Sequence, residues 1–325
     1  MKVSVIVPVY KVEKFIEKCA VSLFSQTLQD VEFIFVDDAS PDNSIQILRK
    51  CIREHPQRES QIKILTHEAN KGLPAARNTG LAVAEGEYIF HCDSDDFVEP
   101  DMLEQLYDTA KRKNADIVWC DWYLSFEHSE RYMRQPCYNT STEALKAMLA
   151  GTMKFNVWNK LTRNRLYKDN GIIFPAGYAM GEDMTMMLLF VHAGSVAYLP
   201  HAFYHYVKTN PEAYSREYSK KHLDSIMHNI KIVEEAVHKH FGQALDLEIG
   251  CMKLEAKFPF LMSDSSSMYR LWQSTYPEAN KYIMRNHYIS IRRRLVQWCA
   301  SKRLWILVRL HELLVNRIIY GLFFK

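Results

Sequence analysis

Three carboxylates within four positions, Asp93, Asp95 and Asp96, are the side chains of this chain best suited to binding a cation. They follow the apolar residues 88–90, which are typical of a buried strand. Carboxylates this close repel one another unless a cation lies among them, and open α/β sheets hold ligands at the carboxyl ends of their strands. The segment therefore predicts a divalent-metal site that faces a phosphorylated ligand. The alternative is a solvated acidic turn that caps a helix beginning near Pro100.

The elements that would position these carboxylates alternate between strand and helix patterns over residues 1–122. Apolar, β-branched runs predict strands at 3–7, 31–36, 62–65, 87–92 and 116–122. Helical spacing and capping residues predict helices at 12–26, 40–54, 72–84 and 100–114. Repeated βα units of this length predict an α/β fold, with a mostly parallel central sheet and helices on both faces.

The pattern changes twice after residue 122. Residues 123–215 are irregular and aromatic, whereas residues 216–325 show mainly helical spacing, most clearly at 220–241. We therefore expect an α/β domain over 1–215, itself divided near residue 122, and a helical C-terminal region over 216–325.

Composition fits a globular protein, because 48% of the 325 residues are hydrophobic and 24% are charged. Seven cysteines without a CxxC pair indicate reduced thiols rather than a disulfide framework. The N-terminus shows no signal-peptide pattern, and no apolar run approaches the roughly 20 residues of a membrane span. We expect a cytoplasmic protein, or one bound peripherally to the inner face of the cell membrane.

The net charge of +3 is unevenly distributed, since residues 285–325 hold nine Lys and Arg but one acid, Glu312. Helical spacing over 302–325 puts polar residues on one side and apolar residues on the broad remainder. This pattern, within 290–325, predicts a helix at the surface of an anionic membrane. The alternative is a helix packed on the protein itself or on a second subunit. The rest of the chain is acidic, which disfavours a nucleic-acid partner.

Three further motifs lie at or just beyond the ends of predicted strands, at residues 7–10, 36–40 and 70–80. Each has an ordinary structural interpretation: Pro8 can end a strand, Asp38 can cap a helix, and Arg77 can be a surface residue. Adjacent parallel strands would nevertheless bring all these motifs and the acidic segment to one crevice.

In this order and spacing the motifs resemble those of the family 2 glycosyltransferases. They are VSVIVPVY (3–10), FVDDAS (35–40), NKGLPAARNTG (70–80), CDSDDF (92–97) and GED (181–183). The resemblance covers residues 1–210 and implies the GT-A fold, in which 1–122 bind a nucleotide-diphosphate sugar and 123–215 serve the acceptor. It implies inverting transfer of one sugar to a hydroxyl of a glycan or lipid-linked acceptor, as in bacterial surface polysaccharide synthesis. The QxxRW motif of processive synthases is absent, which favours transfer of a single sugar.

The resemblance also assigns roles to individual residues. The donor-binding residues would be Pro8, Val9, Tyr10, Asp38, Asn70, Arg77, Asp93 and Ser94. Tyr10 would stack on the base, Asp38 would accept a hydrogen bond from it, which favours uracil, and Arg77 would reach the phosphates. Asp95, together with Asp93, would bind Mg²⁺ or Mn²⁺, hard ions that prefer oxygen ligands.

On the acceptor side, Asp183 would be the catalytic base that takes the proton of the acceptor hydroxyl. Glu182 and Trp158 would contact the acceptor, and His205 would be a further metal ligand. Each has an alternative: Glu182 and Asp183 can cap a helix, His205 can pack among aromatic side chains, and Trp158 can belong to an ordinary strand or turn.

Two other classes of protein remain as alternatives. A nucleotidyltransferase that forms sugar nucleotides also uses a βα sheet and acidic metal ligands, but its glycine-rich phosphate loop has no counterpart at residues 8–13. A non-catalytic module that binds sugar nucleotides is disfavoured because Asp93, Asp95 and Asp183 are all present.

Overall fold

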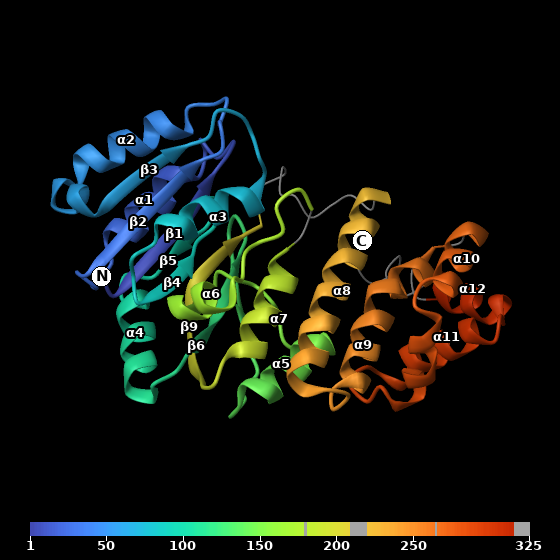
Figure 1. The fold of residues 1–325 in the computed structure, drawn as a ribbon. Helices are drawn as coiled ribbons and strands as arrows, with labels where there is room; N and C mark the ends of the chain where they lie inside the picture. Colours follow the sequence, from blue (N-terminus) through green and yellow to red (C-terminus); the bar gives the residue numbers. More distant parts are fainter. Residues whose placement is uncertain (179–180, 209–219, 264, 315–325) are drawn as a thin grey trace. The chain divides into compact units, whose positions relative to one another are not determined.

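The computed structural model describes residues 1–178, 181–208, 220–263 and 265–314 (Figure 1). The chain divides into two compact units. We call Met1–Ala144 with Phe155–Asn229 the α/β unit, and Leu145–Lys154 with Ile230–Lys325 the helical unit. The domain boundary expected near residue 215 lies outside the described residues. Among the described helices, none has the length and hydropathy needed to cross a bilayer.

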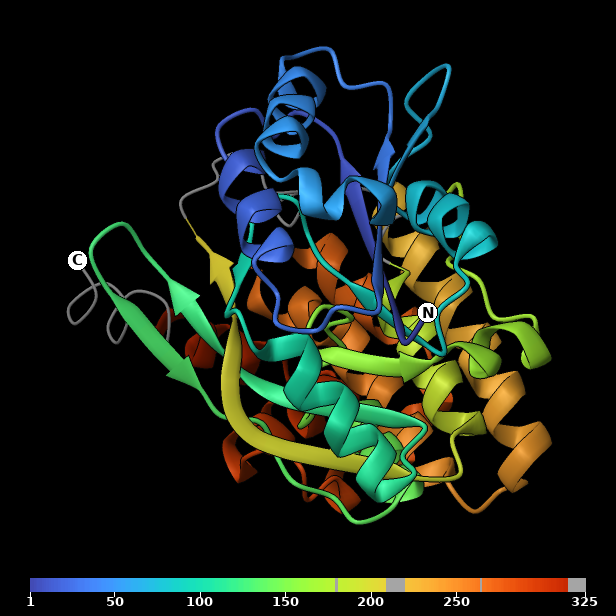
Figure 2. The ribbon, with the colours of Figure 1, turned by 90° about the vertical axis from the view of Figure 1, so that its left-hand side faces the viewer.

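A single sheet organises the described part of the α/β unit, with strand order β3-β2-β1-β4-β8-β6-β9-β5 and β7 paired to β6 (Figure 2). The strands are β1 (Val3–Val9), β2 (Val31–Asp37), β3 (Ile62–Thr66), β4 (Tyr88–His91), β5 (Phe97–Val98), β6 (Ile117–Ser125), β7 (Glu130–Met133), β8 (Lys160–Arg163) and β9 (Val196–Val207). From the pairings, β1, β2, β3, β4, β6 and β9 run in one direction, and β5, β7 and β8 run opposite to their neighbours. The predicted α/β fold with a mostly parallel sheet is confirmed.

Three strands of the irregular region, β7, β8 and β9, were not predicted, and the last two change the order of the strands in the sheet. β8 lies between β4 and β6 and pairs antiparallel with both, so the strand expected at 116–122 does not lie beside β4. β9 pairs parallel with β6, and its register shifts twice, at Asp121. Figure 2 shows the strong bend of β9 across the sheet.

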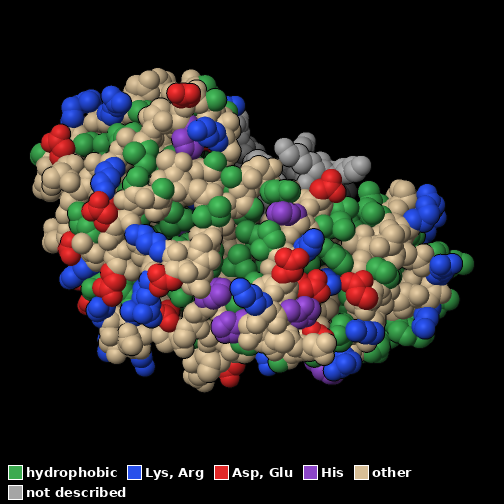
Figure 3. All heavy atoms as spheres, viewed as in Figure 1, with side chains coloured by type: hydrophobic (Ala, Val, Ile, Leu, Met, Phe, Trp, Pro, Cys, Tyr) green, Lys and Arg blue, Asp and Glu red, His purple; other side chains and the backbone are tan. Residues whose placement is uncertain are grey.

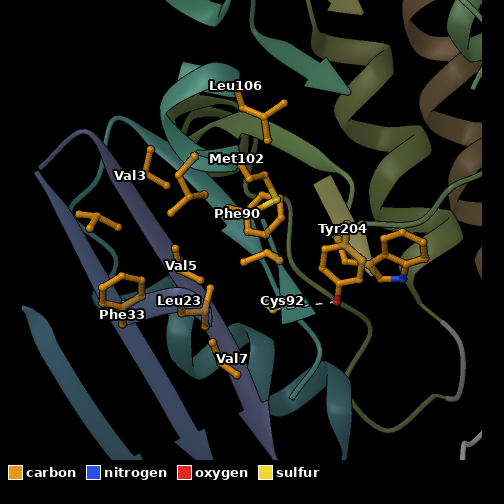
Figure 4. Close-up of a cluster of buried hydrophobic side chains, with 14 of the residues drawn as sticks. Val3, Val5, Val7, Leu23, Phe33, Phe90, Cys92, Met102, Leu106 and Tyr204 are labelled. Atoms are coloured by element: carbon orange, nitrogen blue, oxygen red, sulfur yellow. Dashed lines mark hydrogen bonds between the residues drawn. The ribbon is translucent and has the colours of Figure 1, made fainter. Parts of the chain in front are cut away.

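Helices cover both faces of this sheet. They are α1 (Ile16–Phe24), α2 (Ser44–Glu54), η1 (Pro56–Gln61), α3 (Leu73–Val83), α4 (Met102–Lys113), α5 (Ser141–Leu149), α6 (Asn164–Asn170) and α7 (Glu182–His192), where η marks a 3₁₀ helix and α5 runs into the helical unit. Val3, Val5 and Val7 alternate along β1 and pack in one core with side chains of α1, α2 and α4 (Figure 4). Ile6 points to the other face, where α3 approaches so closely that a Cβ at Gly80 would lie 2.5 Å from the Ile6 side chain.

The helical unit contains the rest of the described helices. They are α8 (Lys220–Phe241, which begins in the α/β unit), α9 (Asp246–Lys257), η2 (Phe258–Met262), α10 (Ser266–Ser274), η3 (Pro277–Arg285), α11 (Ile291–Ser301) and α12 (Trp305–Leu313). The buried Lys257 ammonium at the end of α9 connects this helix with η3 and the two residues before it, because it donates to the carbonyls of Thr275 and Tyr276 and to Asn280 Oδ1 at 2.8–3.1 Å. Burial lowers the pKa of Lys257 to about 8.

The helix expected over 302–325 is described in part. It is preceded by α11, which ends at Ser301, and α12 begins within it at Trp305. Between them Arg303 has φ +60°, a left-handed conformation that ends a helix. Residues 315–325 lie outside the described part of the chain.

Candidate active site

The parallel register of β1, β2 and β4 brings the predicted motifs to one edge of the sheet. Val9 at the end of β1 pairs with Asp37 at the end of β2, and Ile6 of β1 pairs with His91, just before the acidic motif. The loops that follow these three strands therefore leave the sheet side by side, at its carboxyl edge.

The loop after β1 exposes one side chain of its motif. Pro8 and Val9 are buried, whereas Tyr10 is 39% exposed. The loop is fixed to the end of β2, because Asp38 N–H donates to Val9 O at 3.0 Å and Lys11 N–H donates to Ser40 Oγ at 2.8 Å. An aromatic ring is thus held at the edge where the strands end, as stacking on a base requires.

Asp38, which was expected to bind a base, forms several hydrogen bonds within the protein. Its Oδ1 accepts from Lys71 N–H at 2.8 Å and lies 2.6 Å from His67 Nδ1, while its Oδ2 accepts from Gly72 N–H at 2.8 Å. The carboxylate is 3% exposed. Asp38 therefore fixes the loop that carries the exposed Asn70, and its predicted hydrogen bond to a base stays a prediction.

Arg77 occupies a place that sequence reasoning did not find. We expected it to reach phosphates, but the guanidinium is fully buried and bridges the two acidic motifs. Its Nη2 donates to Asp93 Oδ1 at 2.7 Å, and its Nη1 donates to Glu182 Oε1. A planar guanidinium suits two carboxylates at once. Each terminal nitrogen has a second N–H beyond these contacts, and the expected phosphate contact stays a prediction.

The acidic motif is anchored from below by Tyr204 of β9. Tyr204 Oη donates to Asp96 Oδ2 at 2.8 Å and accepts from Asp93 N–H at 3.0 Å, while Val207 N–H donates to Asp96 Oδ1 at 2.7 Å. Burial, reinforced by the charges of Asp95 and Asp93, raises the pKa of Asp96 well above its usual range. Asp96 is therefore a structural carboxyl, and Asp93 and Asp95 are the partly exposed ones. Ser94 between them is buried.

The partly exposed pair suits a magnesium or manganese ion that arrives with a ligand. Among the described residues, no group of three or more His, Cys, Asp or Glu is arranged to hold a metal by itself. Mg²⁺ is commonly bound by one or two carboxylates together with substrate phosphates. The donor set of Asp93 and Asp95 fits such an ion.

Glu182 and Asp183 form the first turn of α7, on the other side of Arg77. Asp183 Oδ1 accepts from its neighbour's amide, Met184 N–H, at 2.8 Å, and from the Asn229 side chain at 3.5 Å. Burial raises the pKa of Asp183 to about 6, and burial also raises the pKa of Glu182, against the opposing effect of the Arg77 charge. A carboxylate with a pKa near the working pH is suited to accept a proton.

Trp158 lies beneath the acidic motif rather than on an open surface. It is 5% exposed and stacks on Tyr204 at 4.5 Å and on Tyr206 at 5.3 Å between ring centres. Its neighbour Lys160 is also buried and donates to Asn156 O and Asn159 Oδ1. Burial lowers the pKa of Lys160 to about 7, while the nearby Glu182 charge opposes that effect. Trp158 is thus placed to support the site, and the sequence did not identify Lys160 as a neighbour of Glu182.

His205 has partners other than the acidic motif. Its Nδ1 lies 2.7 Å from Glu130 Oε1 and its Nε2 lies 2.8 Å from Glu99 Oε1, with the ring stacked between Phe97 and Tyr123. Both ring nitrogens are therefore engaged, and metal ligation by His205 stays a prediction. Neighbours along β9 face opposite sides of the sheet, so His205 and Tyr204 point in opposite directions. The same alternation could have identified Tyr204 as the residue that faces the motif.

Comparison with known proteins agrees with this geometry. Residues 4–183 match the family described as Glycosyl transferase family 2. The relative named Uncharacterized glycosyltransferase EpsJ, from Bacillus subtilis (strain 168), is 33% identical over 250 residues, 74% of this chain and 71% of that protein. Poly(ribitol-phosphate) beta-glucosyltransferase of Bacillus spizizenii is 29% identical over 224 residues, 67% of this chain but 34% of that protein.

The crystal structure of S. aureus TarS 1-349 in complex with UDP-GlcNAc has a similar fold, with a TM-score of 0.74 at 20% identity over 100% of this chain and 93% of that one. This likeness confirms the GT-A fold. The family match covers more than half of the chain, and the motifs that carry it meet at one edge of the sheet. The chain belongs to glycosyl transferase family 2.

Proposed function

We propose that the chain is a metal-dependent, inverting glycosyltransferase that moves one sugar from a UDP-sugar to a hydroxyl of a glycan or lipid-linked acceptor. The observation that carries the proposal is the link between a proton-accepting carboxyl and the acidic motif. Asp183, with its pKa raised to about 6, follows Glu182, and Glu182 is joined through Arg77 to Asp93. One ion-paired network thus joins Asp93 of the acidic motif to Glu182, the residue next to Asp183.

The donor nucleotide would lie along the loops after β1 and β2. Tyr10 is exposed there and can stack on a base. Asp38 Oδ2 accepts one hydrogen bond among the described residues, from Gly72, so it keeps capacity for the N3–H of uracil. Asn70, exposed on the loop that Asp38 fixes, would contact the nucleotide, and Ser94 would contribute from the acidic motif. The TarS structure with UDP-GlcNAc supports a uridine donor by analogy of fold.

Asp95 and Asp93 would hold Mg²⁺ or Mn²⁺ together with the donor diphosphate. The ion supplies positive charge where the leaving nucleoside diphosphate becomes more negative. Arg77 fixes one oxygen of Asp93 at 2.7 Å, so the orientation of that carboxylate does not depend on the ion. Buried Asp96, tied to Tyr204 and Val207, keeps the turn of the motif in place.

Asp183 would take the proton of the acceptor hydroxyl as that oxygen attacks the anomeric carbon. A single displacement from the face opposite the leaving group inverts the configuration. Glu182 is 24% exposed at the side chain, and we keep it as a contact for the acceptor. Trp158 would act indirectly, by holding the half-buried Tyr206. A relative named for transfer to poly(ribitol-phosphate) supports a polymeric or lipid-linked acceptor of the kind used in polysaccharide synthesis.

The proposal is tested by measuring nucleoside-diphosphate release from a panel of nucleotide sugars with Mn²⁺, alongside donor binding by thermal shift. We expect UDP-sugars to stabilise the protein, Asp95→Asn to lose both stabilisation and turnover, and Asp183→Asn to keep donor binding but lose turnover. Asp108→Asn, an exposed carboxylate of α4, is the matched control and should leave both unchanged.

Two results would contradict the assignment. Near-normal turnover of Asp183→Asn would exclude it as the base. Stabilisation by other nucleotide sugars but not by UDP-sugars would overturn the uridine preference.

A further inference from the structure

The last two described helices expose apolar side chains in regular stripes. On α11 these are Ile291, Leu295 and Trp298, at 40–54% exposure. On α12 and just beyond it they are Ile306, Leu307, Leu310 and Leu314, of which Ile306 is 84% exposed. We call these seven residues the C-terminal apolar surface. Spacings of three and four residues place the members of each stripe on one face of their helix.

These stripes are separate from the core of the helical unit. Val296 and Ala300 of α11 and Val308 of α12 are buried, and Trp305 stacks on Tyr269 of α10 at 4.9 Å. Both helices thus already have an inward apolar face. When a helix is apolar on its inward face and also on an outward face, the outward face marks a site of interaction with a second apolar environment.

The charges around this surface are mainly positive, since Glu312 is the one acid of α11 and α12 among the described residues. Arg292, Lys302, Arg303 and Arg309 are exposed, and none forms an ion pair with a described acid. Arg293 differs from these four residues, because it pairs with Glu255 at 2.9 Å and lies over the Phe258 ring. Its charge therefore stabilises the helical unit itself. Figure 3 shows hydrophobic and Lys or Arg side chains next to each other over α10–α12, with Asp and Glu concentrated elsewhere on that face.

Two kinds of occupant can be compared on this basis. A second copy of the chain, docked by a two-fold axis, would bring the same four cations against one another. An anionic bilayer surface instead offers negative headgroups to the cations and an apolar layer to Leu, Ile and Trp. Trp is also the side chain that membrane interfaces favour. The positive charges around the C-terminal apolar surface therefore favour an anionic bilayer over a second copy of the chain.

We propose that the C-terminal apolar surface and its four flanking cations bind the surface of an anionic lipid bilayer. The two short helices would lie in the headgroup region without crossing it, consistent with the absence of a spanning helix among the described residues. Binding of this kind brings the protein to the place where lipid-linked molecules are found. The inference does not rest on the proposed reaction, because binding to vesicles is measured without donor or acceptor.

The experiment is flotation of the full chain with vesicles of phosphatidylcholine alone or with about 30% phosphatidylglycerol. We expect the protein to float with the anionic vesicles only. Ile306→Ser/Leu310→Ser and, separately, Arg292→Glu/Arg309→Glu should each lower the partition coefficient by at least about tenfold. The control variants are Phe126→Ser, an apolar side chain 47% exposed in the α/β unit, and Arg53→Glu, an exposed cation of α2. Both controls should float as the wild type does.

Three results would overturn the proposal. Absence of flotation by the wild type would exclude bilayer binding. Unchanged flotation of both double variants, with a shift from dimer to monomer in light scattering, would identify a second copy as the occupant. Unchanged flotation with a lowered Tm of Ile306→Ser/Leu310→Ser would show that these side chains stabilise the protein's own fold.

Discussion

At the scale of single residues, Arg77 contacts both Asp93, which is 16 positions away in the sequence, and Glu182, which is 105 positions away. It is buried, yet both of its carboxylate partners are partly exposed, with 23% of the Asp93 side chain and 24% of the Glu182 side chain accessible. The cation therefore sits beneath the site and presents two oriented carboxylates toward solvent. A residue in this position acts through its neighbours and need not touch the substrate itself.

The first prediction concerns Arg77→Lys, which keeps the charge but removes the planar fork. A lysine ammonium can bind one of the two carboxylates but cannot reach both in their different directions. Asp93 and Glu182 would therefore no longer be oriented by one side chain. We expect turnover to fall about 100-fold, since small displacements in a catalytic constellation cost rates of this order. Steady-state turnover and donor affinity, measured together, check this.

A matched control is available at the other end of the strands. Arg163 of β8 pairs with the buried Asp116 at 3.2 Å and lies opposite Tyr88, where β4 begins, whereas the acidic motif follows the end of β4. Arg163→Lys should lower the Tm while leaving turnover at the assay temperature unchanged. If both substitutions lowered turnover equally, loss of stability rather than of orientation would explain the effect, and the role given to Arg77 would be wrong.

The second prediction follows from the raised pKa of Asp183. As a base the carboxyl must be ionised, so turnover should fall as the pH drops through about 6. Stability should respond in the opposite sense. A folded pKa above the unfolded value, 3.8, means that ionisation costs stability, and this cost is fully present above about 6 and absent below 3.8.

Asp183→Asn removes that cost while keeping an acceptor for Met184 N–H. We therefore expect its Tm to exceed the wild-type Tm at pH 8 and to match it near pH 4, with Asp108→Asn showing no such pH dependence. Thermal unfolding across this range measures the difference. An Asn variant that is no more stable than the wild type at pH 8 would contradict the burial argument.

At the scale of elements, β9 supplies the hydrogen bonds that fix the acidic motif. It is also the strand that was hardest to predict from the sequence. The strand contains Pro200 and gains extra residues against β6 at two points, so the period of two that marks a strand is interrupted. By contrast, β1, β2, β3 and β4 are short, apolar and regular, and they could be predicted almost to the residue. Only beyond the interruption does β9 alternate cleanly, through Tyr204, His205 and Tyr206.

The third prediction tests the anchor that β9 provides. Tyr204→Phe removes the hydroxyl that donates to Asp96 and accepts from Asp93 N–H, and leaves a buried carboxyl without that donor. We expect a loss of about 1–3 kcal/mol in the free energy of unfolding and weaker Mn²⁺-dependent donor binding. Denaturant unfolding and calorimetric titration measure the two effects.

Tyr198→Phe is the control for this substitution. It removes a similar hydrogen bond, from Tyr198 Oη to the buried Asp121 at 2.8 Å, at a distance along the strand from the acidic motif. This variant should lose stability but keep donor affinity. Unchanged donor affinity in Tyr204→Phe would show that the motif keeps its geometry without the anchor.

At the scale of the whole molecule, the sequence indicated an α/β part followed by a helical part. Helical spacing from residue 220 correctly predicted α8, and the two compact units divide within that helix, after Asn229. The helical unit also takes Leu145–Lys154 from the first half of the chain. The periodicity of apolar residues indicates local helices and strands. It does not indicate which segments that are distant in the sequence pack in the same core.

The positions of site residues could be predicted from the sequence where these residues directly follow a predicted strand. Tyr10, Asp93 and Asp95 lie where the parallel register requires. The partners of Arg77, Asp38 and His205 were not predictable, because each depends on a contact with a segment distant in the sequence. Long-range hydrogen bonds of buried polar groups leave no local signature.

The anchoring of the acidic motif by β9 also determines when the site can form. The hydrogen bonds from Tyr204 and Val207 to Asp96 span 108 and 111 residues, and contacts of such separation form late in folding. As the chain emerges from the ribosome, strands β1 to β4 are present long before the residues that hold the acidic turn. A nascent chain can thus contain strands β1 to β4 and still lack the hydrogen bonds that fix the acidic turn, which form only once synthesis has passed β9.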